Sequence, residues 1–183
     1  MAPRSVLPMS TTGAVVTAIS TPATASGLAL DLPARLLDQE FGRGRVARFE
    51  DVDFPATLTH EPTRRFLRET GLPEDEILFS LDTDLPLPTL TEYYTDEEYT
   101  GDFPLDQLPE NADHLIRLGR IAGNAGLVIE GATGEILRWT EPEARLDPLN
   151  RDVSELVLAL CLLRTGGAEA MGDMEAVAGI EPA

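Results

Sequence analysis

The residues that could perform acid–base or nucleophilic chemistry in this sequence are two histidines and one cysteine. His60 stands at the entrance of a predicted helix, where it can hold the first turn, and His114 stands at the start of a predicted strand. No nucleophile-elbow pattern accompanies either histidine. Cys161 lies within an apolar run and is expected to be a small buried side chain. We therefore expect no catalytic residues, with an enzyme acting through His60, His114 and nearby acids as an alternative.

Metal and cofactor sites also lack their usual spacing. The sequence has no paired cysteines and no His-x-x-x-His. Asp82 and Asp84 begin like a calcium loop, but Pro86 and Pro88 follow where a glycine and further ligands are needed. The glycine-rich turn at 122–126 lacks the strand–turn–helix context and the lysine of a phosphate-binding loop. The sequence predicts no metal and no cofactor.

The charge balance excludes some classes of partner. Of the 183 residues, 32 are acidic and 14 are basic, which gives a net charge of -18, and every basic residue is arginine. Nucleic-acid backbones and anionic membrane surfaces both attract clustered positive charge, so neither is an expected partner. A single cysteine permits no intramolecular disulfide, and no stretch reaches the ~20 apolar residues of a membrane span. We expect a cytoplasmic protein.

The acids are concentrated in residues 74–113, which we call the acidic window. This window holds 13 acids and no arginine, so it carries -13, and the other 143 residues carry -5. It also contains all three tyrosines. Tyrosine is frequent in binding hot spots, and an acidic field steers a basic partner. The predicted partner contacts are Tyr93, Tyr94, Glu97, Glu98, Tyr99 and Asp102.

The same window has simpler interpretations. The acids alone are typical of a solvated face that keeps the protein in solution. The tyrosines can equally pin an irregular segment to the core. Outside the window, Arg64 and Arg68 lie one helical turn apart and are expected to pair with Glu61 or with the acidic window.

The first half of the chain shows two helix signals. Asp31 is expected to cap a helix that presents Leu36, Leu37 and Phe41 on one face, and Thr59 is expected to cap a second helix that ends at Gly71. Short strands are predicted at 45–49 and 77–81, followed by a long irregular insertion at 82–113.

The second half of the chain predicts strands and one closing helix. Strands are expected at 114–121, 127–130 and 135–139, the last two forming a hairpin. Asn150 or Asp152 is expected to cap a final helix that Gly166 and Gly167 terminate.

This order of elements predicts an α+β domain, with a mostly antiparallel sheet packed against N-terminal and C-terminal helices. The domain is expected to span 30–166. It would follow a disordered or leader segment at 1–29, with a signal peptide as the alternative, and precede a flexible tail at 167–183.

The string LLDQEFGRGRVARFEDVDFPATLTHEPTRRFLRETGLP, residues 36–73, resembles the start of SUKH superfamily immunity proteins of the fourth subfamily. The matching positions are Pro55, Ala56, Thr59, His60, Pro62, Thr63, Arg64, Phe66, Leu67, Gly71, Leu72 and Pro73. The hairpin from Leu118 to Trp139 and the helix at 150–163 resemble the later part of the family pattern.

This resemblance implies a SUKH-like α+β fold and a bacterial immunity protein that neutralises a polymorphic toxin domain by protein–protein interaction in the producer's cytoplasm. Many such toxins act on nucleic acid and must present a basic surface, which an acidic protein can cover. The family brings no catalytic residues. A stand-alone adaptor or regulatory domain without a toxin is the alternative function.

Overall fold

The computed structural model describes residues 24–81, 85–121 and 125–178, and it confirms the α+β class. A five-stranded antiparallel sheet in the order β3-β4-β5-β6-β7 forms the centre, and β1 pairs with β2 beside it. The strands are β1 (Val46–Ala47), β2 (Leu72–Pro73), β3 (Phe79–Ser80), β4 (Leu115–Ile121), β5 (Ala125–Glu130), β6 (Ile136–Thr140) and β7 (Arg145–Asn150). The α-helices are α1 (Leu36–Glu40), α2 (Glu61–Glu69), α3 (Leu90–Thr95) and α4 (Val153–Ala178), and the 3-10 turns are η1 (Arg43–Arg45), η2 (Asp51–Asp53), η3 (Leu105–Gln107) and η4 (Ala112–His114).

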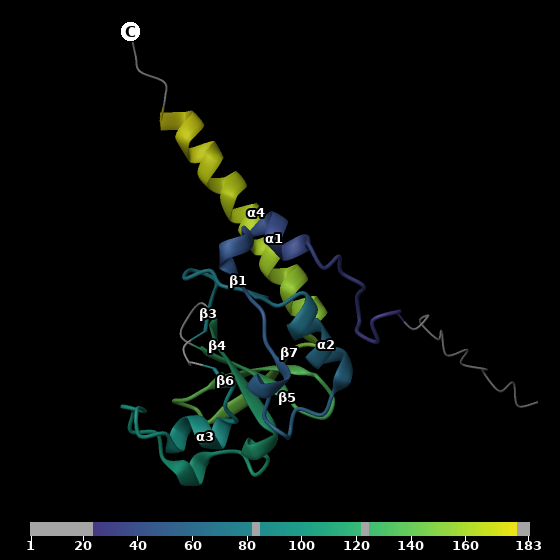
Figure 1. The fold of residues 1–183 in the computed structure, drawn as a ribbon. Helices are drawn as coiled ribbons and strands as arrows, with labels where there is room; N and C mark the ends of the chain where they lie inside the picture. Colours follow the sequence, from purple (N-terminus) through teal and green to yellow (C-terminus); the bar gives the residue numbers. More distant parts are fainter. Residues whose placement is uncertain (1–23, 82–84, 122–124, 179–183) are drawn as a thin grey trace, which may run out of the picture.

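The central sheet is covered on both faces, because successive side chains of a strand point to opposite sides. In β5, Leu127 and Ile129 belong to a core shared with α1, α2 and α4, whereas Val128 belongs to a second core beneath α3. Figure 1 shows α2 and α4 on one side of the sheet and α3 on the other. This arrangement explains the continuous apolar run of β5, which has no solvent-facing side.

Two predicted helix caps are wrong. Asp31 does not cap α1, whose N-cap residue is Arg35; instead the Asp31 carboxylate accepts hydrogen bonds from the backbone N–H groups of Ala25 and Ser26. The α2 helix has His60 rather than Thr59 at its N-cap position. The Asp31 carboxylate therefore stabilises a turn within residues 24–31 instead of the start of α1.

The start of α4 confirms one predicted cap and joins distant parts of the chain. The Asp152 carboxylate accepts a hydrogen bond from the Ser154 backbone N–H at 2.9 Å. It also accepts one from the Ala29 N–H, and the Ser154 hydroxyl accepts one from the Leu30 N–H at 3.0 Å. Residues 24–30 are thus held against the beginning of the last helix.

Several element boundaries differ from the predictions. The helix α4 continues through Gly166 and Gly167, so the predicted helix end at these glycines is wrong. Strand β7 was not among the predicted strands, and it pairs with β6. Of the β4–β5 turn predicted at 122–126, residues 122–124 lie outside the described residues, and Ala125 and Gly126 belong to β5 rather than to a turn. The predicted β5–β6 hairpin is confirmed by the register Ile129↔Ile136.

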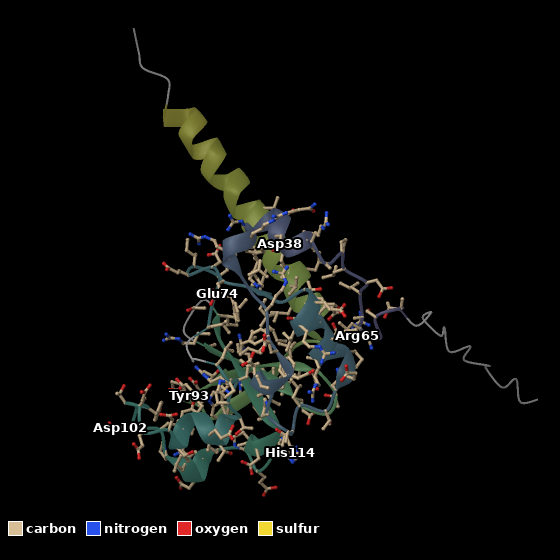
Figure 2. All side chains as sticks on the ribbon, in the orientation of Figure 1. Asp38, Arg65, Glu74, Tyr93, Asp102 and His114 are labelled. Carbon is tan, nitrogen blue, oxygen red and sulfur yellow. The ribbon has the colours of Figure 1, made fainter. Side chains whose placement is uncertain are left out.

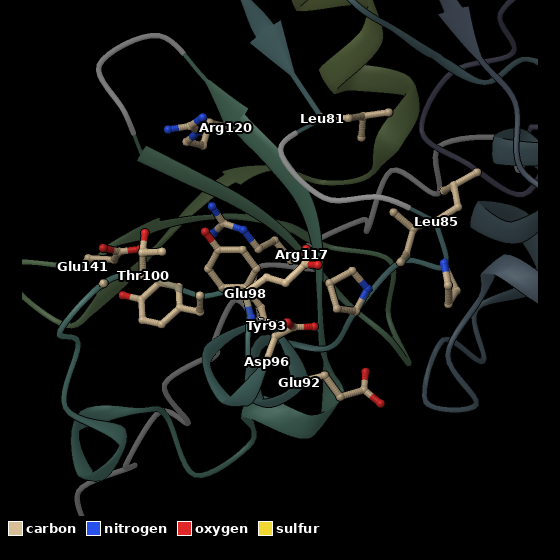
Figure 3. Close-up of a pocket in the computed structure, with 15 residues that line it drawn as sticks. Leu81, Leu85, Glu92, Tyr93, Asp96, Glu98, Thr100, Arg117, Arg120 and Glu141 are labelled. Carbon is tan, nitrogen blue, oxygen red and sulfur yellow. Dashed lines mark hydrogen bonds between the residues drawn. The ribbon is translucent and has the colours of Figure 1, made fainter.

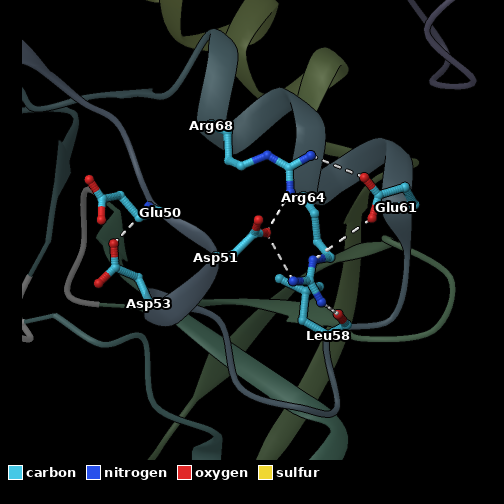
Figure 4. Close-up of polar contacts among 7 residues, drawn as sticks. All are labelled: Glu50, Asp51, Asp53, Leu58, Glu61, Arg64 and Arg68. Carbon is cyan, nitrogen blue, oxygen red and sulfur yellow. Dashed lines mark hydrogen bonds and ion pairs between the residues drawn. The ribbon is translucent and has the colours of Figure 1, made fainter.

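The arginines of α2 form an ion-pair network that fixes η2 against the helix (Figure 4). Asp51 accepts hydrogen bonds from Arg64 and Arg68, and the expected pairing with Glu61 is confirmed by a 3.1 Å contact to Arg68. The hydrogen bonds from Arg64 and Arg68 lower the pKa of Asp51 below its ordinary value. Because both carboxylates are exposed and the two arginines are only half-buried, the network contributes little to stability and serves mainly to orient η2.

Candidate partner-binding face

Within its described residues, which leave out Asp82 and Asp84, the acidic window divides into two groups. Glu74 lies beside β1, where its N–H donates to the Arg45 carbonyl, and Asp75 accepts a 2.8 Å hydrogen bond from Arg164. Figure 2 shows Glu74 well separated from Asp102, which lies near α3. The window is therefore not a single surface, and only its later part gathers around α3.

We define the α3 face as the acids of residues 85–113 together with Tyr93 and Tyr99. The eight acids are Glu92, Asp96, Glu97, Glu98, Asp102, Asp106, Glu110 and Asp113, and all of them are exposed. No arginine occurs between residues 85 and 113. The α3 face thus combines a uniform charge with two partly exposed phenol rings.

The helix that carries this face begins with a capping box. The Thr89 hydroxyl accepts a hydrogen bond from the Glu92 N–H at 3.2 Å, and the Glu92 carboxylate accepts one from the Thr89 N–H at 2.8 Å. Leu90 and Tyr94, four residues apart, are buried beneath it. The prediction of irregular structure is wrong here, although the Thr-x-x-Glu spacing before an apolar residue was a usable signal.

Tyr94 is the centre of an aromatic cluster rather than an exposed side chain. It is 4% exposed, and its ring lies 4.8 Å from Phe103 and 5.0 Å from Tyr99. Trp139 donates its indole N–H to the Tyr94 hydroxyl at 2.7 Å, and that hydroxyl donates to Glu141 at 2.7 Å. Burial and the Glu141 carboxylate raise the pKa of Tyr94.

Tyr93 and Tyr99 are half-buried and pack on this cluster. Their rings are 5.5 Å apart, and the guanidinium carbon of Arg117 lies 3.9 Å from the centre of the Tyr93 ring. Burial raises the pKa of Tyr99, the Glu141 charge acting in the same direction. Tyr94 thus anchors residues 90–103 to the core, as one interpretation of the tyrosines predicts. Tyr93 and Tyr99 stay partly exposed, which leaves them accessible to a partner, as the other interpretation requires. Contact with a partner stays a prediction for all six sequence-predicted residues.

A pocket of about 1010 Å³ opens beside the α3 face (Figure 3). Tyr93, Tyr99 and Glu98 line it, and so do Arg117, Arg120 and Glu141, which the sequence analysis did not single out. Arg117 could have been recognised from the sequence, because it is a charged residue within an otherwise apolar strand, and a charged residue is rarely buried without a specific partner. Glu141 carried no such signal, because its role depends on the tyrosine hydroxyl it accepts from.

The two histidines do not form a shared reactive site: His60 holds neighbouring backbone and side-chain groups, and His114 is exposed. The His60 Nδ1 is 2.8 Å from the Thr63 hydroxyl, and the His60 backbone N–H donates to the Gly131 carbonyl. The His114 side chain is exposed. Within the described parts of the chain, no three His, Cys, Asp or Glu side chains gather as a metal-binding group. Nor does any helix there have both the length and the apolar character needed to cross a membrane.

The surroundings of His60 predict a pH-dependent stability. Burial lowers the pKa of His60 and outweighs the charges of Asp152 and Glu130, which act in the opposite direction. The unfolded chain therefore binds this proton more readily than the folded chain, so the contribution of neutral His60 is complete above about pH 6.5 and is lost as the pH falls towards the lowered value. We expect the free energy of unfolding in urea to decline between pH 7.5 and 5.5, and His60→Gln to flatten that decline. An equal decline in both proteins would contradict this origin.

Comparison with known proteins gives one match. A family model described as SUKH-4 immunity protein matches residues 32–175, a range that includes α1, α2, the whole sheet and most of α4. The searches among curated proteins and solved structures gave no match. The resemblance carried by the sequence motifs is therefore confirmed, and it extends further along α4 than the motifs did.

Proposed function

Because this chain belongs to the SUKH-4 immunity protein family, we propose that it neutralises a cognate toxin domain by covering a basic surface of that toxin with its α3 face. The observation that carries the proposal is the eight exposed acids of the α3 face around two half-buried tyrosines. Tyr93 and Tyr99 present rigid rings already held by the core, so little side-chain entropy is lost when a partner covers them. The two rings contribute most of the affinity for the toxin, and the acids speed its association by attracting its basic surface.

The partner that fits this face is a toxin acting on nucleic acid. Such a toxin must present arginines or lysines to phosphate groups, and those same groups attract the α3 face. An acidic protein that occupies them excludes the substrate. The mechanism is occlusion by binding and requires no catalytic residue in this chain. Its setting would be the cytoplasm of the producing bacterium, where the toxin's nucleic-acid targets also lie.

The proposal is tested with a polymorphic toxin domain whose gene adjoins the gene of this protein. We expect the two purified proteins to form a complex that abolishes toxin activity, with an association rate that falls steeply between 50 mM and 500 mM salt. The rate should fall because salt screens the attraction between the two proteins beyond about 8 Å at physiological ionic strength. Absence of a complex at 50 mM salt would overturn the proposal. Capture of a non-toxin protein, with no protection of cells against the toxin, would favour an adaptor role instead.

A further inference from the structure

The pocket beside the α3 face has a lining that is partly apolar and partly acidic. The apolar side chains flank and follow β3: Leu81, Leu85, Pro86, Leu87 and Pro88. The carboxylates come from α3, from the loop after it and from the residue after β6: Glu92, Asp96, Glu98 and Glu141. Figure 3 shows Leu81 and Leu85 on the side opposite Glu141, with Tyr93 between them. The lining therefore offers both hydrocarbon and negative charge to a guest.

The charges of the lining favour a cation. Four carboxylates face two guanidiniums, and one of these, Arg117, is 2% exposed and already stacked on the Tyr93 ring. Gly126 makes this arrangement possible, because a Cβ at Gly126 would lie 2.6 Å from the Arg117 Nη1 atom. Arg117 therefore belongs to the structure of the pocket, and with four carboxylates and two guanidiniums the lining carries a net negative charge.

We propose that this pocket receives one arginine side chain of the toxin, a proposal that rests on the proposed function. The methylene stem of arginine packs on Leu85 and the neighbouring prolines, as long charged side chains do on apolar surface. Its planar guanidinium stacks on the ring of Tyr99 and forms paired hydrogen bonds with a carboxylate such as Glu98. Arginine suits the site better than lysine because its guanidinium is weakly hydrated and stacks on aromatic rings.

Gly101 provides a way to change the shape of the pocket without changing its charge. A Cβ at Gly101 would lie 2.2 Å from the Tyr99 hydroxyl oxygen. Gly101→Ala therefore displaces the Tyr99 ring while every carboxylate stays in the protein. Glu98→Gln makes the complementary change, removing one charge with almost no change in shape. Glu74→Gln is the matched control, because Glu74 is exposed and lies away from the pocket.

The first experiment titrates the full chain with Nα-acetyl-arginine methylamide and follows the rings of Tyr93 and Tyr99 by NMR. We expect saturable shifts with a dissociation constant on the order of millimolar, typical of one small group. Glu98→Gln and Gly101→Ala should each weaken binding by about fivefold or more, and Glu74→Gln should leave it unchanged. The neutral citrulline analogue should produce no saturable shift. Equal responses to both probes, or saturable shifts with inorganic phosphate instead, would overturn the proposal.

The second experiment separates this inference from the proposed function. In the complex with the toxin, Glu98→Gln and Gly101→Ala should raise the dissociation rate by about tenfold, because a buried charge contact acts mainly on dissociation. If the toxin binds all variants equally, the pocket proposal fails and the proposed function stands. If the arginine probe binds but the toxin does not, the proposed function fails.

Discussion

Replacing both Glu97 and Asp102 with lysine is expected to slow association with the toxin by about 10- to 100-fold at low salt, within the range that electrostatic steering supplies. Both side chains are exposed at the edge of the α3 face, where charges act on the encounter more than on the final complex. The dissociation rate should therefore change less than the association rate. Stopped-flow or surface plasmon resonance measurements at 50 mM salt resolve the two rates.

The matched control reverses the same number of charges at the other end of the acidic window. Glu74 and Glu76 are exposed in the loop between β2 and β3, away from α3. Their double replacement by lysine changes the net charge equally, so it should slow association by no more than about threefold. Equal slowing by both pairs would show that overall charge, rather than the α3 face, steers the encounter.

Tyr94→Ala is expected to lower the free energy of unfolding by about 3–5 kcal/mol, the usual cost of deleting a buried aromatic side chain. The ring packs against Tyr93, Tyr99 and Phe103, and its removal leaves the buried indole N–H of Trp139 without its hydrogen-bond acceptor. Urea unfolding followed by the fluorescence of Trp139, the only tryptophan, measures the loss.

Tyr94→Phe separates the packing of this residue from its hydrogen bonds. The ring stays, but the bonds to Trp139 and Glu141 are lost, so we expect a loss of about 1–3 kcal/mol. Toxin binding by the folded variant should match the wild type, because Tyr94 is 4% exposed and acts by positioning its neighbours. Weaker toxin binding with unchanged stability would instead make Tyr94 a direct contact, as the sequence pattern predicts.

The sequence was most informative where local chemistry decides the conformation. The β5–β6 hairpin follows from two apolar runs around a glycine-containing turn, and the cap of α4 follows from Asp152 before an apolar repeat. The two wrong helix caps fall where several residues competed for one role. Thr59 and His60 both precede α2, and Asp31 found backbone donors at Ala25 and Ser26 instead of a helix.

The sequence by itself determined the net charge, the concentration of acids, the α+β class and the family motifs, because all of these are properties of composition or of neighbouring residues. Only the tertiary structure decided which tyrosine is buried, which acids share a surface and how Arg117 meets Tyr93. Those outcomes depend on pairs far apart in the chain, such as Tyr94 and Trp139, which are separated by 45 residues. Such pairs meet only when the sheet brings α3 over β4, β5 and β6, and spacing along the chain does not specify which side of a ring then faces water.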